Sequence, residues 1–383
     1  MSEKNSYIGA TIFDGQVMHE DCALLVTDER IDGIVDKDKV GADYKCARLE
    51  GGILSAGFID LQVNGGGGIL FNEMPTLKGI QIICDAHLKF GTTALFPTLI
   101  TDTVDITKRA LEAAVQAQSN NIPGFLGLHL EGPHISIEKK GAHKDDLIRP
   151  MTDEDLDLLC TAKSHLDNLL VTLAPESVSD EQVSVLTKLG IRVSLGHSAA
   201  TAFKAEKFFM AGASSVTHLY NAMSPLTHRE PGIVGAALNA DKVYCGLIAD
   251  GFHVDPDAIN IALKMKTGEG KLYLVTDAMS TIGTEQEEFT LNDRKIQRKN
   301  GRLTLSDGTL AGADLDMISA VQFMAESTNC TKDEALRMAS SYPANYLNIH
   351  QNHGRLTSGA YCNIVHLSNN LDLISVWQRG QIS

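Results

Sequence analysis

Residues 191–220 read IRVSLGHSAATAFKAEKFFMAGASSVTHLY and contain the unit that repeats through the middle of the chain. A short apolar run over 191–197 is followed by a stretch with helical spacing over 201–212 and by a second apolar run over 214–220. Apolar runs that alternate with helical stretches predict βαβ units, whose strands pair in a parallel sheet. This unit therefore predicts an α/β fold.

The same alternation extends over most of the chain. Eight apolar runs predict strands, over residues 56–63, 92–99, 124–131, 169–176, 191–197, 214–220, 243–251 and 271–277. Helical spacing between them covers residues 105–118, 153–166, 180–190 and 201–212. Eight strands that alternate with helices over about 250 residues are typical of a (β/α)8 TIM-type barrel. Residues 287–310 alternate and turn at Asn-Asp, Asn-Gly and Asp-Gly pairs, which predicts hairpins over the mouth of the barrel.

The two chain ends have a different pattern. Both hold short apolar pieces separated by Gly, Asp, Ser and Asn, which is typical of strands joined by tight turns. Because the ends are alike, we expect them to pair in one small β-sandwich domain. The predicted organisation is a small β-domain from residues 1–54 together with 350–383, and a catalytic barrel domain from 55–349.

Composition limits the partners of the protein. The 383 residues include 33 Lys+Arg and 48 Asp+Glu, and the resulting net charge of −15 disfavours nucleic acid as a partner. No apolar run approaches the roughly 18 residues of a membrane span, and the N-terminus lacks a secretory pattern, so we expect a cytoplasmic protein without a membrane partner. The seven cysteines include no CxxC pair, which disfavours a thiolate zinc site.

The ends of the predicted strands carry the residues that suggest chemistry. In a barrel of this kind, the carboxyl ends of the strands form the active site. Glu131, His197 and His218 lie at the ends of the third, fifth and sixth predicted strands. A single histidine there is more often a hydrogen-bonded core residue than a ligand, but two imidazoles and a carboxylate together form a catalytic metal site. We therefore expect a divalent metal at this end of the barrel.

Asp277 ends the eighth predicted strand and should face the same pocket. A carboxylate there can accept a proton from water, which makes Asp277 the candidate general base. The alternative is a cap for a helix that begins at Ala278. We favour the base, because the strand before Asp277 is apolar and ends at the catalytic face.

Several loop residues follow the strand ends and could hold an anionic sugar, namely His143, Asn221, Ala222, Arg229 and His253. Arginine suits phosphate because its planar guanidinium donates two parallel hydrogen bonds. A loop arginine can equally form a solvated surface ion pair that contributes little. The residues alone therefore leave the role of Arg229 open.

Nine motifs occur in a fixed order, namely SAGFIDLQVNG, LHLEGPH, KKGAH, LAPE, LGHS, THLYNAM, REPG, IADGFHVD and LVTDAM. Together they resemble the N-acetylglucosamine-6-phosphate deacetylases of the amidohydrolase superfamily, from about residue 8 to the C-terminus. The resemblance implies a metal-bearing barrel with a small β-domain. It also implies a hydrolase of amino-sugar catabolism, which converts N-acetyl-D-glucosamine 6-phosphate into D-glucosamine 6-phosphate and acetate.

The resemblance implies a role for each candidate residue. It places one divalent ion on Glu131, His197 and His218, with Zn²⁺ as the best fit and Fe²⁺, Co²⁺ or Mn²⁺ as alternatives. Asp277 would activate water and protonate the leaving amine, and His143 would contact the substrate carbonyl. Substrate-binding positions would be Ala142, His143, Asn221, Ala222, Arg229 and His253. The resemblance also implies a homodimer or a larger homo-oligomer, in which Arg229 reaches the neighbouring subunit's site.

One motif departs from the wider superfamily. Many amidohydrolases have His-x-His at the end of the first barrel strand, where this chain has Gln62 and Asn64. Amides are poorer ligands than imidazoles, so we expect one tight metal ion and assign Gln62 to water or a weak second ion.

Two alternative functions remain open from the sequence. N-acetylgalactosamine 6-phosphate differs from the first substrate in the orientation of one hydroxyl group, which sequence separates poorly. The other alternative is a catalytically silent protein that uses the same fold for binding or assembly. Retention of Glu131, His197, His218 and Asp277 together argues against this second alternative.

Overall fold

Eight parallel strands form the centre of the molecule. A computed structural model describes residues 2–383, so Met1 of the predicted small domain lies outside the described residues. The strands are hydrogen-bonded in the order β17-β16-β15-β14-β13-β12-β11-β8. Their bounds are β8 Phe58–Val63, β11 Thr92–Ile100, β12 Leu128–Glu131, β13 Leu169–Leu173, β14 Arg192–Leu195, β15 Ser215–Val216, β16 Tyr244–Leu247 and β17 Leu272–Leu274.

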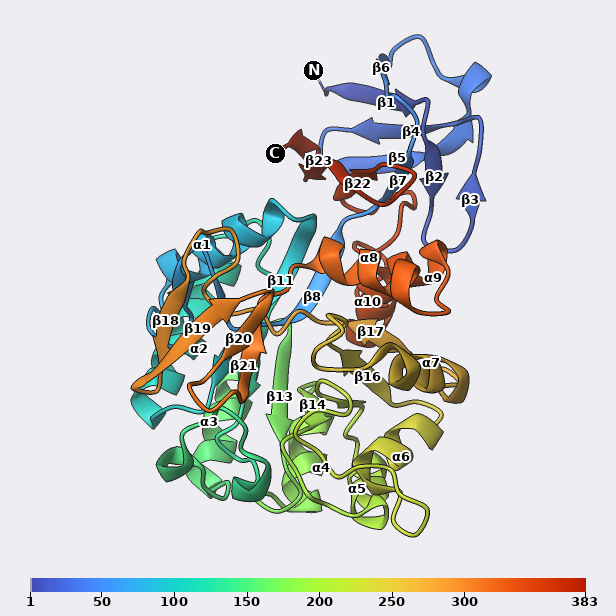
Figure 1. The fold of residues 1–383 in the computed structure, drawn as a ribbon. Coiled ribbons are helices and arrows are strands. Elements are labelled where there is room, and N and C mark those ends of the chain that lie inside the picture. Colours follow the sequence, from blue (N-terminus) through green and yellow to red (C-terminus); the bar gives the residue numbers. More distant parts are fainter. Residues whose placement is uncertain (1) are drawn as a thin grey trace.

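Contacts between the first and last strands close this sheet into a barrel. Val63 at the end of β8 bridges Ala278 beyond β17, and the Asp277 N–H donates to the Gln62 carbonyl at 3.0 Å. The predicted barrel is confirmed, and each predicted run contains strand residues (Figure 1). β15 is much shorter than predicted because the chain leaves extended geometry by His218, whose φ is 31°.

Helices cover the barrel from outside. Their bounds are α1 Leu77–Leu88, α2 Val104–Ser119, α3 Asp153–Lys163, α4 Asp180–Lys188, α5 Ala202–Met210, α6 Gly232–Asn239, α7 Pro256–Met265, α8 Met317–Ser327, α9 Lys332–Ala339 and α10 Ser341–Leu347. The four predicted helices correspond to α2, α3, α4 and α5. Each begins after a serine or threonine whose side chain accepts a hydrogen bond from the first turn, namely Thr103, Thr152, Ser179 and Thr201. Within residues 2–383, none of the helices is long and apolar enough to cross a membrane.

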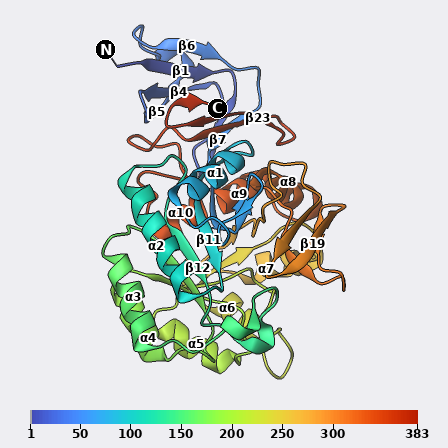
Figure 2. The same cartoon turned by 90° about the vertical axis from the view of Figure 1, so that its left-hand side faces the viewer.

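An insert of four antiparallel strands follows β17, and we use this name for residues 287–313. It consists of β18 Glu288–Leu291, β19 Arg294–Lys299, β20 Arg302–Thr304 and β21 Leu310–Ala313, paired in chain order. The predicted hairpins are confirmed. Figures 1 and 2 show the insert alongside the barrel, away from the strands of the chain ends. Short elements that follow β8 and β12 in the chain are β9 Gly65–Gly66, β10 Ile69–Leu70 and the 3-10 helices Ile137–Lys139 and Asp145–Leu147.

The two chain ends form two sheets that lie at one end of the molecule (Figure 1). One has the order β5-β4-β1-β6, and the other has the order β24-β23-β22-β7-β2-β3. Their bounds are β1 Lys4–Ile8, β2 Thr11–Phe13, β3 Met18–His19, β4 Cys22–Thr27, β5 Arg30–Asp36, β6 Lys45–Arg48, β7 Ile53–Ala56, β22 Ile364–Leu367, β23 Leu373–Gln378 and β24 Gln381–Ile382, with a 3-10 turn at Lys37–Lys39. Leu24 and Ile31 from the first sheet share one buried cluster with Leu54 and Ile364 from the second. The chain ends thus pair as expected, while the exact domain boundaries stay a prediction.

Candidate active site

A cavity lies at the carboxyl ends of the barrel strands and has a volume of about 190 Å³. Most of the predicted site residues line it, namely Glu131, Ala142, His143, His197, His218, Asn221, Ala222, His253 and Asp277. A wider hollow of about 650 Å³ lies against the chain ends, but none of the predicted site residues lines it. The cavity at the strand ends is therefore the candidate active site.

Three ligand-type atoms meet in this cavity. Glu131 Oε1 lies 3.1 Å from His197 Nε2 and 3.1 Å from His218 Nε2, and the two imidazole nitrogens are 3.0 Å apart. Ligands that share one Zn²⁺ in a tetrahedral arrangement lie about 3.3 Å from one another, so these atoms fit a common divalent ion. The His197 Nδ1–H donates to the Lys139 carbonyl at 2.8 Å, which leaves the Nε2 lone pair free for such an ion.

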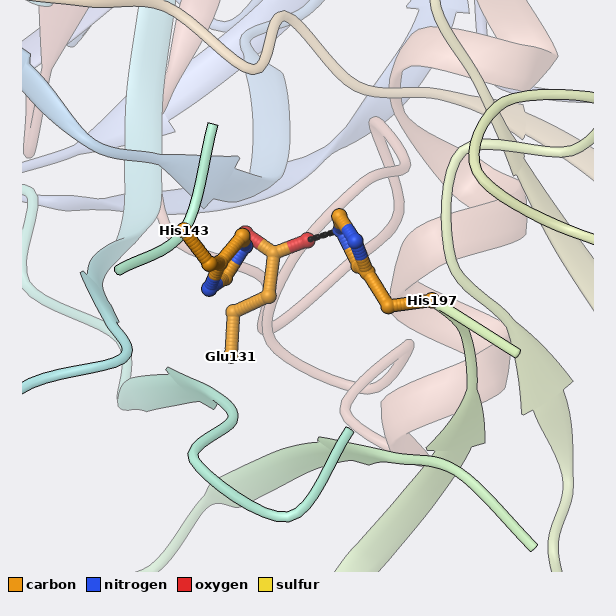
Figure 3. A group of neighbouring side chains, drawn as sticks. All are labelled: Glu131, His143 and His197. Carbon is orange, nitrogen blue, oxygen red and sulfur yellow. Dashed lines mark hydrogen bonds and ion pairs between the residues drawn. The ribbon is translucent and has the colours of Figure 1, made fainter. Parts of the chain in front are cut away.

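His143 forms a second buried group with two of these residues. Ligand-type atoms of Glu131, His143 and His197 lie within 4.8 Å of one another, and Figure 3 shows the Glu131 carboxylate between the two rings. However, the Thr101 backbone N–H donates to His143 Nδ1 at 3.3 Å, so this nitrogen is an acceptor. Burial lowers the pKa of His143 to about 3, and the resulting neutral ring must carry its proton on Nε2. His143 therefore suits a hydrogen-bond donor better than a metal ligand, and His218 remains the better third ligand.

Strained backbone positions three of these side chains. His197, His218 and Asp277 have φ values of 48°, 31° and 53°. Positive φ is uncommon for residues other than glycine, costs about 1–3 kcal/mol and gathers at functional sites. Each of the three residues comes within two or three positions of a strand end, where the chain turns out of the barrel. Strained backbone therefore occurs at the strand ends that carry these three side chains.

Two amide side chains hold Asp277. Asn64 Nδ2 donates to Asp277 Oδ1 at 2.6 Å, and Gln62 Nε2 donates to the same oxygen at 3.2 Å. Gln62 Nε2 also lies 3.1 Å from Glu131 Oε1, so it links the two carboxylates. Burial, together with repulsion from Glu131, raises the pKa of Asp277 to about 6. A carboxyl group with a pKa near neutrality can both accept and release a proton.

The predicted substrate-binding residues fall into two groups. Ala142, Asn221, Ala222 and His253 line the cavity, and His253 is oriented by Asp250, whose Oδ2 lies 2.6 Å from its Nδ1. Arg229 is exposed in the loop before α6 and does not line the cavity of its own chain. Among residues 2–383, neither lysine nor arginine lines this cavity.

Known proteins share both the sequence and the fold. The sequence profile of the amidohydrolase family matches residues 53–382. The chain belongs to the amidohydrolase family. It is therefore a hydrolase that acts on an amide bond, and the resemblance read from its motifs is confirmed. The family depends on metal, which agrees with the buried Glu and His cluster.

Relatives of this amidohydrolase cover nearly its whole length. An N-acetylgalactosamine-6-phosphate deacetylase from Shewanella sp. (strain ANA-3) is 41% identical over 98% of this chain and 94% of its own. An N-acetylglucosamine-6-phosphate deacetylase from Haemophilus influenzae is 35% identical over 99% of both chains. The crystal structure of the N-acetylglucosamine-6-phosphate deacetylase from Pasteurella multocida has a TM-score of 0.95 and 34% identity, with 99% of both chains covered.

The amidohydrolase site also includes residues that the sequence did not reveal. Thr101 directly follows β11, so the rule used for the other strand ends could have found it. Leu291 and Leu310 of the insert line the cavity as well. Their contribution had no signal in the sequence, because apolar residues alternate in any hairpin that has one buried face.

Proposed function

We propose that this amidohydrolase hydrolyses the acetamide of N-acetyl-D-glucosamine 6-phosphate and releases D-glucosamine 6-phosphate and acetate. The observation that carries the proposal is the position of Asp277, a buried carboxyl group joined through Gln62 to the Glu131 metal-ligand cluster. The relatives named above add support for an amino-sugar phosphate. A Mycobacterium smegmatis deacetylase with 25% identity and a TM-score of 0.89 was solved in complex with N-acetyl-D-glucosamine-6-phosphate.

The proposal includes one divalent metal ion per subunit. Glu131, His197 and His218 would hold it, and Zn²⁺ suits this ligand set, although Fe²⁺, Co²⁺ and Mn²⁺ accept the same ligands. When bound, such an ion supplies a Lewis acid that polarises the amide and lowers the pKa of water. The Gln62 side-chain nitrogen already donates to two carboxylates, so its oxygen is the group left for water or a weak second ion.

The side chains of the cavity have complementary roles in this proposal. His143 would donate its Nε2–H to the acetamide oxygen, where negative charge develops as water attacks the carbonyl carbon. Asp277 would accept a proton from that water and then deliver it to the amine nitrogen as the C–N bond breaks. Asn64 holds the Asp277 carboxylate at 2.6 Å and so keeps it directed at the reacting atoms.

We also propose that the substrate phosphate is bound by His253 together with Arg229 of a neighbouring subunit. The reason is that the cavity in residues 2–383 has no lining lysine or arginine, while Arg229 is exposed on a loop of the same chain. The protein would accordingly be a homodimer or a larger homo-oligomer. We infer a cytoplasmic location, since a charged sugar phosphate does not cross a bilayer unaided.

Replacing Arg229 with alanine should weaken catalysis on the phosphorylated sugar. A charge-assisted hydrogen bond contributes about 1.5–3 kcal/mol, so kcat/KM for N-acetyl-D-glucosamine 6-phosphate should fall about 10-fold to 100-fold. The value for free N-acetylglucosamine should change much less. Steady-state kinetics on both sugars checks this, with the exposed Arg109 of α2 changed to alanine as a matched control.

Mixed oligomers test which subunit supplies Arg229 to a given active site. A subunit carrying R229A keeps its own Asp277, and a subunit carrying D277N can lend it Arg229. Mixing and reassembling the two variants should therefore restore part of the activity. Equal loss on both sugars by R229A would remove its phosphate role, and no recovery on mixing would assign Arg229 to its own subunit.

A second substrate is favoured by one observation. The Shewanella relative, at 41% identity, is named for N-acetylgalactosamine 6-phosphate. The two sugar phosphates share the acetamide and the phosphate, so both proposed functions use the same residues. Measuring kcat/KM for both epimers distinguishes them. We expect the gluco epimer to be preferred, and a preference of about 10-fold or more for the galacto epimer would change the assigned substrate while retaining the mechanism.

A further inference from the structure

The insert forms part of the wall of the active site. Leu291, Leu310 and Gly312 line the cavity from its strands. Its buried side chains share one apolar cluster with the barrel, made of Leu70, Ile100, Met279, Phe289, Leu291, Ile296, Leu303 and Ala311, with Ala142 packed against it. The insert is therefore anchored to the barrel, and it reaches the segment that carries His143.

Two side chains at the hairpin of β18 and β19 donate hydrogen bonds to one backbone carbonyl. Asn292 Nδ2 donates to the Ala142 oxygen at 3.1 Å, and the Arg294 guanidinium donates to the same oxygen. Asn292 and Asp293 have φ values of 52° and 60°, which is typical of a two-residue turn between antiparallel strands. Lys144 Nζ, two residues after Ala142, lies 3.8 Å from Asp293 Oδ2. Two residues of the turn and the first residue of β19 thus contact one short segment.

The Ala142 carbonyl and the His143 N–H belong to the same planar peptide unit. Its oxygen is held by Asn292 and Arg294, and its N–H donates to the Lys140 carbonyl at 3.1 Å. The segment from 140 to 144 contains no helix or strand that would fix it otherwise. Because both ends of the peptide unit are held, the direction of the His143 Cα–Cβ bond is set by the insert as well as by the segment itself.

We propose that Asn292 and Arg294 are positioning residues for His143, acting through the Ala142 carbonyl. The inference rests on the proposed function, in which His143 donates to the acetamide oxygen. Neither residue lines the cavity, so neither is expected to touch the substrate. Arg294 contributes a charged donor on a strand, and it therefore holds the segment more firmly than a neutral side chain would.

Replacing Arg294 with methionine removes the donor and keeps most of the apolar stem. Displacement of a catalytic group by about 1 Å costs up to about 100-fold in rate, so kcat should fall about 10-fold to 100-fold with little change in KM. R294K keeps a charged donor group and should recover part of the loss. The control is K295M, because Lys295 is the next residue of β19, is exposed and pairs with Glu288 within the insert.

A double-mutant cycle with His143→Gln separates positioning from general support of the fold. If Arg294 acts through His143, R294M should cost less than about 3-fold in the H143Q background. An equal loss in both backgrounds, or wild-type kcat in R294M, would overturn the proposal. Loss of bound metal in R294M would overturn it too, because Arg294 would then act through the metal ligands.

Hydrogen exchange gives a readout that does not depend on the reaction. Amides in the segment from 140 to 147 should exchange faster in R294M than in the unchanged protein and in K295M. Unchanged exchange would contradict the proposed contact. Failure of the unchanged protein to release acetate from any amino-sugar phosphate would overturn the proposed function instead, and the exchange experiment would still decide whether Arg294 holds the segment.

Discussion

Asp277→Asn should lower kcat by about 10³-fold or more while the fold and the bound metal are retained, because general acid-base catalysis contributes about 10²–10⁴-fold and one residue performs both proton transfers. Asparagine keeps the shape of the side chain but cannot accept a proton from water at neutral pH. It is also suited to the backbone, since Asp277 has a φ of 53° and asparagine tolerates this region. The loss should therefore report chemistry rather than strain.

A matched control lies between β3 and β4 of the chain-end sheets. Asp21 has a φ of 54° and an exposed side chain paired with Lys37, so D21N makes the same change on similar backbone far from the cavity. Steady-state kinetics, metal analysis and thermal unfolding of both variants make the comparison. If D277N retains more than about a tenth of the wild-type kcat, Asp277 is not the residue that moves the proton.

His218→Asn should remove most of the bound metal and, with it, the activity. His218 Nε2 lies 3.1 Å from Glu131 Oε1 and 3.0 Å from His197 Nε2, so its loss leaves two ligands of three. We expect metal content to fall from about one ion per chain to below about a tenth, with kcat reduced at least about 10³-fold. Metal analysis after dialysis against a weak chelator checks the metal content. The control is H19N, in β3 of the chain-end sheets.

The same metal analysis on a His143 variant decides whether His143 or His218 is the third metal ligand. H143N should keep its metal and lose turnover, because Thr101 donates to Nδ1 and leaves no lone pair on Nε2 of the neutral ring. The opposite pattern, in which H143N loses the ion and H218N retains it, would assign the third ligand to His143.

The barrel was predictable because its signals are local. Each barrel strand is an apolar run bounded by turns, and the strand ends of a parallel sheet meet at one edge. This is why Glu131, His197, His218 and Asp277 could be grouped before their distances were known, and why the cavity gathers them. Strand lengths were less predictable. The apolar run over 214–220 holds only two strand residues, since its later part turns outward through positive φ values.

Contacts that depend on tertiary packing could not be predicted. Nothing in the sequence around Arg294 indicates that its guanidinium meets the Ala142 carbonyl, more than a hundred residues earlier. The bonds from Gln62 and Asn64 to Asp277 likewise join the first and last barrel strands, and they exist only because the sheet closes. Arg229 is exposed and does not line the cavity of its own chain, so no contact within residues 2–383 indicates its proposed phosphate role.

We propose that the protein carries out a metal-dependent deacetylation in this cavity. The most direct test is acetate release from N-acetyl-D-glucosamine 6-phosphate by the purified protein, measured before chelation, after chelation and after Zn²⁺ is restored. We predict release that disappears with the metal and returns with it, in proportion to the ion bound per chain. Acetate release that is unaffected by complete metal removal would contradict this proposal. So would a lack of acetate release from protein that carries a full complement of metal.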